Sequence, residues 1–216
     1  MPIFLACALG MIATIPLQFL SLEHLKLEKK FGKEKGAKIG EILGIISGWS
    51  FFLFLIGIWI APQPKFRIPV LYDIIVKIPI AELSIPLFHL ILGFPLLLIG
   101  GWLGISGVKE LSLSVSETHR PTRVIKTGVY SHVRHPQYLG GLLAHIGITL
   151  ILSAFYSLLY TPILMFIVYL IARKEEMELI KEFGDEYEEY RRRVPMFIPR
   201  IRKRKFTKNL PHENYP

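Results

Sequence analysis

The sequence predicts an all-α polytopic membrane protein with about five transmembrane helices and a cytosolic C-terminal helical segment. Of its 216 residues, 51% are hydrophobic, yet the formal net charge is +9. The apolar residues form long blocks, and the basic residues cluster between them. This segregation is typical of membrane proteins, whose basic loops face the cytoplasm. Because the basic clusters adjoin apolar spans, we expect no nucleic-acid partner.

Five apolar segments have lengths suited to crossing a bilayer, which takes about 20 helical residues. The first three are residues 2–22, 39–61 and 85–105. Residues 139–172 then contain no Lys, Arg, Asp or Glu. One helix of that length would reach about 50 Å, too long for a hydrocarbon core of about 30 Å. We therefore expect a hairpin of two spans that turns near residues 153–160, and a charged helix that continues beyond residue 172.

The distribution of basic residues predicts the orientation. Of the 26 lysines and arginines, all but Lys65, Arg67 and Lys77 fall in connections that share one side of the membrane. The positive-inside rule makes that side cytoplasmic. The N-terminus is then outside and the C-terminus inside, which agrees with an odd number of spans.

Cys7 is the only cysteine, so neither an internal disulfide nor a cysteine metal cluster is expected.

Glycines recur at four-residue spacing within two of the spans. They are Gly40, Gly44 and Gly48 in the second span, and Gly100 and Gly104 in the third. A nucleotide-binding loop would need a strand before the glycines. Inside apolar helices, this spacing instead indicates close helix packing.

Two polar clusters flank the predicted hairpin and should emerge on the same side of the membrane. The first is Tyr130, Arg134, His135 and Tyr138, and the second is Arg173, Glu175, Glu176 and Glu178. Ionisable groups at membrane spans are functional candidates. Each cluster alone also fits a structural role, as interface anchors or as a solvated helix face. Together they predict one pocket at the cytoplasmic helix ends.

The stretches "TGVYSHVRHPQYLGG" and "RKEEMELIKEFGDEYEEYRRRVP" resemble the isoprenylcysteine carboxyl methyltransferase family, within a wider group that includes membrane phospholipid methyltransferases. The resemblance covers about residues 120–199. It divides the chain into an N-terminal three-span region (1–119), a catalytic and cofactor-binding region with the hairpin (120–199) and a basic tail (200–216). The tail suits anionic lipid headgroups.

The resemblance implies S-adenosylmethionine as the cofactor and a prenylated cysteine or another lipophilic molecule as the acceptor. The implied cofactor contacts are Thr122, Arg123, Val124, Ile125, Tyr130, His135, Pro136, Gln137, Tyr138 and Glu175, with Glu176 as the alternative to Glu175. Arg173 matches the arginine of the substrate site. Many members carry histidine at the position of Thr122, and His119 could substitute if the loop is longer.

The chemistry of these residues is compatible with that cofactor. A glutamate can accept from its ammonium, and Arg134 or His135 can engage its carboxylate or ribose. Tyr130 and Tyr138 can contact the adenine or the sulfonium. A carboxylate acceptor would need a positioning cation such as Arg173, whereas an amine acceptor would need a base, Glu176 or His135.

The sequence therefore predicts carboxyl methylation of a prenylcysteine-type substrate, in a membrane and without a metal. The alternatives are phospholipid N-methylation, an NADPH-dependent reductase of the sterol type, and a non-enzymatic membrane scaffold.

Overall fold

A computed structural model describes residues 1–70, 74–78, 83–118 and 121–199 of the chain. The basic tail and His119 lie outside the described residues. The helical elements are α1 (Pro2–Leu22), α2 (His24–Phe31), α3 (Lys33–Ile60), α4 (Leu87–Leu111), α5 (Leu113–Thr118), the 3-10 turn η2 (Gly128–Ser131), α6 (Pro136–Ile151), α7 (Phe155–Phe183) and α8 (Asp185–Arg193). Two short antiparallel strands, β1 (Ile75–Ile78) and β2 (Leu83–Pro86), form a hairpin between α3 and α4.

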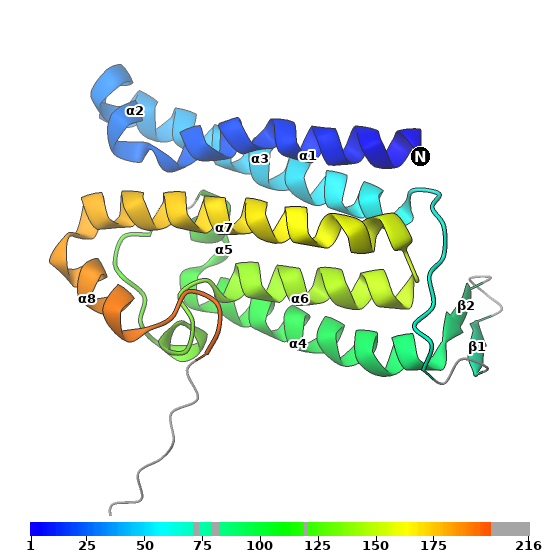
Figure 1. Cartoon of the computed structure of the whole chain (residues 1–216). Helices are drawn as coiled ribbons and strands as arrows, with labels where there is room; N and C mark the ends of the chain where they lie inside the picture. Colours follow the sequence, from blue (N-terminus) through cyan, green and yellow to red (C-terminus); the bar gives the residue numbers. More distant parts are fainter. Residues whose placement is uncertain (71–73, 79–82, 119–120, 200–216) are drawn as a thin grey trace, which may run out of the picture.

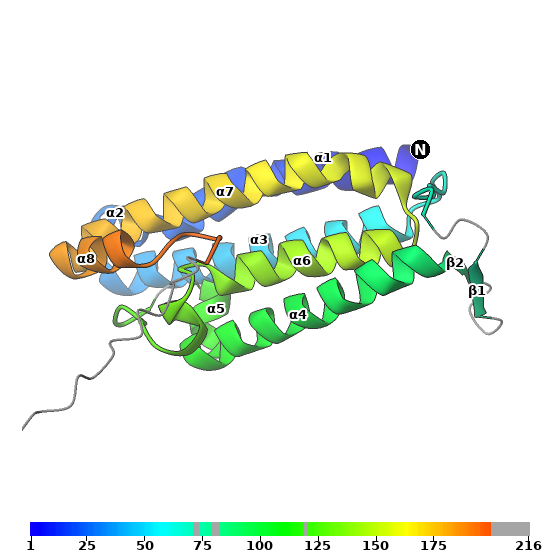
Figure 2. The same cartoon turned by 60° about the horizontal axis from the view of Figure 1, so that its bottom comes forward.

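In the described part of the chain, helices α1, α3, α4, α6 and α7 lie side by side in an elongated bundle (Figure 1). Four of them, α1, α3, α4 and α7, are long and apolar enough to cross a membrane among the described residues. The fifth, α6, has 16 residues and is about 24 Å long. It runs along α4 within the bundle, as the rotated view also shows (Figure 2). The prediction of an all-α polytopic membrane protein is confirmed.

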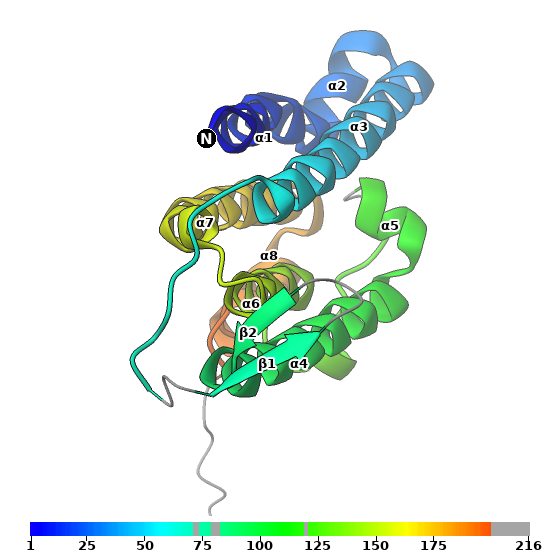
Figure 3. The same ribbon diagram turned by 90° about the vertical axis from the view of Figure 1, so that its right-hand side faces the viewer.

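The predicted helical hairpin is present, with its turn at residues 152–154 between α6 and α7. Its first helix, α6, is too short to count as a span, so the described residues hold four candidate spans where the sequence predicted about five. The turn is tight because Ser153 adopts a positive φ of 51° and its N–H bonds to the Leu150 carbonyl. The connection after α3 packs on it, since the Phe155 N–H donates to the Pro64 carbonyl at 3.1 Å and the Phe66 N–H to the Ser153 carbonyl. Viewed from this end, β1 and β2 lie at the same end of the bundle as the turn (Figure 3).

Glycine pairs explain why α4 and α6 approach so closely. A Cβ added at Gly140 would lie 2.6 Å from the Gly100 carbonyl oxygen, and one at Gly147 would lie 2.6 Å from the Gly93 carbonyl oxygen. Only residues without a side chain allow backbones this near. The packing interpretation is confirmed for Gly100. In α3, Gly40 packs on α2, whereas a Cβ at Gly48 would meet no atom within 4 Å.

Buried polar contacts join three helices inside the bundle. The Trp59 indole of α3 donates to His145 Nδ1 of α6 at 2.9 Å, and His145 Nε2 lies 3.1 Å from the Thr161 hydroxyl of α7. His145 is fully buried. Because Trp59 occupies Nδ1, the proton of neutral His145 is on Nε2 and points to Thr161. The histidine therefore has a packing role.

The N-terminus and the hairpin turn lie at one end of the bundle, and α2, α5 and α8 lie at the other (Figure 1). Helix α7 continues without a break through its charged C-terminal part and ends at Gly184, where φ is +55°. Pro136 begins α6 as its first residue, a position that proline favours because no N–H is needed there. Both polar clusters are consequently brought to the same end.

Candidate functional site

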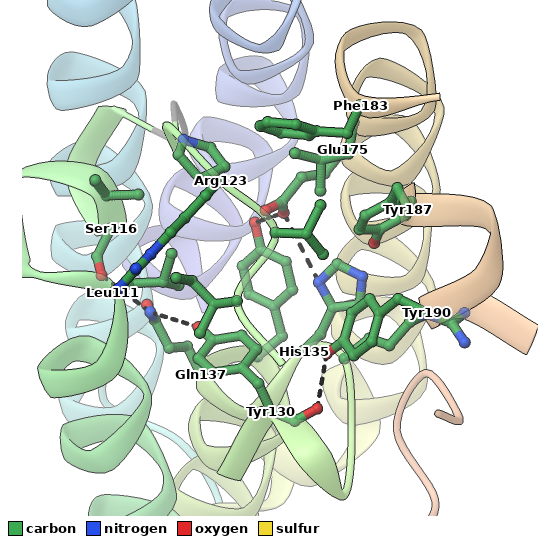
Figure 4. A pocket seen from close by; sticks show the side chains of 17 residues that line it. Leu111, Ser116, Arg123, Tyr130, His135, Gln137, Glu175, Phe183, Tyr187 and Tyr190 are labelled. Carbon is green, nitrogen blue, oxygen red and sulfur yellow. Dashed lines mark hydrogen bonds and ion pairs between the residues drawn. The ribbon is translucent and has the colours of Figure 1, made fainter. Parts of the chain in front are cut away.

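A pocket opens at the end of the bundle that carries α5 and α8 (Figure 4). The loop before α6, the start of α6, the end of α7, α8 and the end of α4 all contribute to it. Its 17 lining residues are Leu111, Val115, Ser116, Pro121, Arg123, Val124, Ile125, Tyr130, Arg134, His135, Gln137, Tyr138, Glu175, Leu179, Phe183, Tyr187 and Tyr190. All four residues of the first predicted cluster therefore line one pocket, together with Glu175 alone from the second cluster.

Glu175 provides a carboxylate at this pocket. Its Oε2 accepts a hydrogen bond from the Tyr138 hydroxyl at 2.8 Å and lies 3.8 Å from His135 Nδ1. The Glu175 side chain keeps 18% exposure, in contrast to the 1% of its neighbour Glu176. The His135 and Tyr138 rings stack with centroids 5.4 Å apart. Glu175 is thus an oriented and accessible acceptor.

Gln137 and Tyr130 form the polar wall opposite Glu175. The Gln137 amide donates to the Tyr130 hydroxyl at 3.1 Å and to the Ser116 hydroxyl at 2.9 Å. Burial raises the pKa of the Tyr130 phenol, and it does the same for Tyr187 and Tyr190 in α8. These phenols therefore remain protonated at neutral pH and can act as hydrogen-bond donors.

Gly128, in the segment "TGVY", holds the loop before α6 in position. Gly128 has a positive φ of 52°, and a Cβ there would collide with the Glu110 carboxylate of α4. Glu110 accepts from the neighbouring Thr127 hydroxyl at 3.0 Å. The loop is therefore tied to α4 at a point where any side chain would clash, and this places Tyr130 in the pocket wall.

The structure does not bring every predicted residue into the pocket. Arg173 is exposed and does not line it, because it shares a stripe of α7 with the exposed Phe166, Tyr169 and Met177. Glu176 is buried behind the pocket, where its Oε1 accepts from Arg134 Nε at 2.7 Å and lies 3.1 Å from His135 Nε2. The assignment of Arg173 to a substrate site within this pocket therefore lacks support from its position.

Two further predicted residues lie beside the pocket. Pro136 is buried at the start of α6 and sets the direction of the chain between His135 and Gln137. Thr122 lines an adjoining hollow together with Glu110 and Ser112. Thr122 thus lines the adjoining hollow but not the main pocket.

Sequence reasoning missed the apolar and aromatic walls. Leu179 and Phe183 follow Glu175 at intervals of four residues, which places all three on one face of α7. Tyr187 and Tyr190 come from "DEYEEY", within the second of the two quoted stretches, for which the resemblance implied no role. Helical spacing from Glu175 would have been sufficient to find Leu179 and Phe183.

Apolar helices long enough to cross a membrane, with a pocket of a carboxylate, tyrosines and apolar side chains at one end, indicate an integral membrane protein with a candidate ligand site at the helix ends. Residues 88–186 match the family model described as phospholipid methyltransferase. The match begins in α4, so it takes in most of the third span, which the resemblance found in the sequence had left out.

Curated relatives agree with this family. The chain is 36% identical over 87 residues to "Protein-S-isoprenylcysteine O-methyltransferase" of Schizosaccharomyces pombe, covering 40% of this chain and 37% of the relative. It is 42% identical over 79 residues to "Methanethiol S-methyltransferase 2" of Bradyrhizobium diazoefficiens, covering 37% and 30%. It is 34% identical over 88 residues to the human "Protein-S-isoprenylcysteine O-methyltransferase", covering 40% and 30%.

The chain thus matches about a third of the length of these curated relatives. Within that part, the predicted resemblance to the isoprenylcysteine carboxyl methyltransferase family is confirmed.

Proposed function

We propose that the protein is an integral membrane methyltransferase that uses S-adenosylmethionine and methylates a lipophilic acceptor. The observation that carries the proposal is the position of Glu175, an accessible carboxylate held by Tyr138 in a pocket at the ends of membrane helices. The similarity to methyltransferases over residues 88–186 supports it.

The residues of the pocket fit this cofactor by chemical type. The Glu175 carboxylate suits an ammonium, because charge-assisted hydrogen bonds are the strong ones. Arg123 lines the pocket and suits a carboxylate, and the Ser116 and Gln137 side chains suit ribose hydroxyls. Leu179 and Phe183 give an apolar wall for an adenine ring. When bound, S-adenosylmethionine would supply an electrophilic methyl group.

The protein's contribution would then be binding, orientation and exclusion of water. Tyr138 fixes the Glu175 carboxylate, and the buried phenols of Tyr130 and Tyr190 close two sides of the pocket. Orientation of two reactants can supply an effective molarity of about 10⁵–10⁸ M, and displacement at a methyl carbon depends on such alignment. A carboxylate acceptor is already a nucleophile at neutral pH and needs no general base, whereas a thiol acceptor must first lose its proton.

Two acceptors follow from the site and its relatives. A prenylcysteine-type carboxylate is the first, as in the names of the fungal and human relatives. A small thiol is the second, because Arg173, the cation assigned to a substrate carboxylate, lies outside the pocket. A thiol acceptor requires no guanidinium, and three relatives are named methanethiol S-methyltransferases.

The test is methyl transfer from labelled S-adenosylmethionine by the purified protein in lipid nanodiscs. A farnesylcysteine acid should give a base-labile methyl ester, and methanethiol should give volatile dimethyl sulfide. Phosphatidylethanolamine, which would give a base-stable N-methyl headgroup, tests the phospholipid alternative. Methyl transfer to none of these acceptors, with no binding of S-adenosylmethionine, would refute the proposal. Stabilisation of the protein by NADPH but not by S-adenosylmethionine would favour the reductase.

The pocket is proposed to face the cytoplasm, with the N-terminus outside. This orientation is supported by the lysines of α2 and the start of α3, which lie at the pocket end of the bundle (Figure 1). In a variant with Cys7→Ser, a cysteine placed at exposed Lys29 should resist an impermeant maleimide in intact cells, and one at exposed Lys77 should react. The reverse labelling pattern would invert the topology.

A further inference from the structure

Residues 194–197, which follow α8, fold back over the turn that precedes α6; we call them the C-terminal strap. The backbone N–H of Arg134 donates to the Pro195 carbonyl at 2.9 Å, and the backbone N–H of His135 donates to the Met196 carbonyl at 3.2 Å. The Phe197 ring lies 5.9 Å from the His135 ring. The strap therefore covers the backbone of Arg134 and His135, the first two residues of "RHP" in the quoted stretch.

The Arg134 guanidinium bonds to two parts of the protein, α7 and the end of α8 with the strap. Its Nε donates to Glu176 Oε1 at 2.7 Å. Its Nη1 donates to the Arg191 carbonyl at 3.0 Å and also to the Val194 carbonyl. The Arg134 side chain is only 9% exposed. This one planar group thus joins α7 to the strap, a geometry that guanidinium provides and ammonium does not.

Glu176 acts on His135 as well as on Arg134. Its Oε1 lies 3.1 Å from His135 Nε2, and Glu176 itself does not line the pocket. A carboxylate only accepts, so the neutral His135 ring carries its proton on Nε2. His135 Nδ1 is then left facing Glu175 Oε2, 3.8 Å away at the pocket. Glu176 thereby determines which histidine nitrogen the pocket presents.

We propose that Arg134 and Glu176 are positioning residues: they clamp the C-terminal strap and fix the tautomer of His135. Arg134 lines the pocket, but its Nε and Nη1 bond to Glu176 and to backbone carbonyls, and Glu176 does not line the pocket. The effect on the site passes through α8, because the strap follows directly from the helix that carries Tyr187 and Tyr190. The Tyr190 hydroxyl also donates to the Tyr130 carbonyl at 2.7 Å, which joins α8 to the loop wall. The consequence for cofactor affinity rests on the proposed function, whereas the clamp does not.

The test of the clamp is hydrogen exchange in Arg134→Lys, with Arg192→Lys as the control. Arg192 is an exposed arginine next to the strap contact. In Arg134→Lys the ammonium cannot bridge Glu176 and both carbonyls, so exchange of the amides of Arg134 and His135 should rise about tenfold or more, as for the loss of one charged hydrogen bond. The control should exchange as the wild type does. Glu176→Gln, which removes the charge and can turn either its amide oxygen or its NH₂ toward His135 and Arg134, replaces Arg134→Lys if that variant does not fold.

The tautomer is tested separately by ¹⁵N spectra of histidine-labelled protein. His135 should be protonated on Nε2 in the wild type and show mixed tautomers in Glu176→Gln. His145 should stay unchanged in both, because Trp59 fixes its tautomer independently.

Three outcomes would overturn the proposal. In Arg134→Lys, unchanged hydrogen exchange at residues 134–135 with weaker cofactor binding would mean direct contact with the cofactor, and faster exchange spread evenly over the protein would mean a purely stabilising ion pair. In Glu176→Gln, an unchanged His135 tautomer would mean that Glu176 does not fix it. If the wild type binds no S-adenosylmethionine, the proposed function fails, and the exchange and tautomer measurements still decide the positioning role.

Discussion

Replacing Glu175 with glutamine is expected to weaken S-adenosylmethionine binding by about 10–100-fold, which corresponds to the loss of one charged hydrogen bond of about 1.5–3 kcal/mol. Glutamine has nearly the same shape, and its amide oxygen can still accept from the Tyr138 hydroxyl, now 2.8 Å from Glu175 Oε2. Only the negative charge at the pocket is lost. Because the pocket wall is preserved, the melting temperature without cofactor should change little.

The measurement is equilibrium binding of labelled cofactor to protein in nanodiscs, with Glu178→Gln as the matched control. Glu178 is on the same helix one turn from Glu175, and it pairs with Lys174 and Lys181, each at 2.8 Å, outside the pocket. The control should retain wild-type affinity. Wild-type affinity in Glu175→Gln would show that another group binds the ammonium, and equal losses in both variants would point to general damage of α7.

The separation of Glu175 from Glu176 and Arg173 shows what the sequence could and could not predict. An α-helix turns about 100° per residue. Arg173 is therefore about 200° from Glu175, on the opposite face of α7, although the two are near in sequence. Glu176 is 100° away and points to Arg134 and His135. The sequence predicted that this helix end lies at the site, but the role of each residue depends on helix rotation, which a cluster of charges does not reveal.

Apolar length and charge segregation were sufficient to predict the bundle. The absence of charge over residues 139–172 predicted the hairpin, because the membrane thickness limits a single helix. The turn falls at residues 152–154, at the N-terminal edge of the predicted region, where the chain after α3 pairs with it. That pairing joins backbone groups far apart in sequence, and no local pattern encodes it.

The C-terminal strap was not predictable for the same reason. Its contacts with Arg134 and His135 are backbone hydrogen bonds across about sixty residues of sequence. From composition, Arg134 had the features of a cofactor ligand, since it is a cation at a polar cluster. Its carbonyl partners, Arg191 and Val194, become visible only when the chain is folded, and they take the donors of Nη1 while Nε donates to Glu176.

Gly140→Val is expected to have the largest effect on folding of any single change considered, a loss of about 3 kcal/mol or more through overpacking. A Cβ at Gly140 would lie 2.6 Å from the Gly100 carbonyl oxygen and 2.7 Å from the Gly104 amide nitrogen. These are backbone atoms of α4, so neither can rotate away. The two helices must separate, and α6 would carry Gln137 and Tyr138 out of the pocket wall.

The control for this variant is Gly141→Val, the same substitution at the next residue of α6. A Cβ at Gly141 would meet no atom within 4 Å, so the change carries only the cost of a β-branched residue in a helix. Size-exclusion profiles and thermal unfolding in detergent should show loss of monodisperse protein for Gly140→Val and near wild-type behaviour for Gly141→Val. Equal effects would attribute the loss to helix propensity. A stable Gly140→Val protein would mean that α4 and α6 are not in backbone contact, and the position of the pocket on that helix pair would have to be revised.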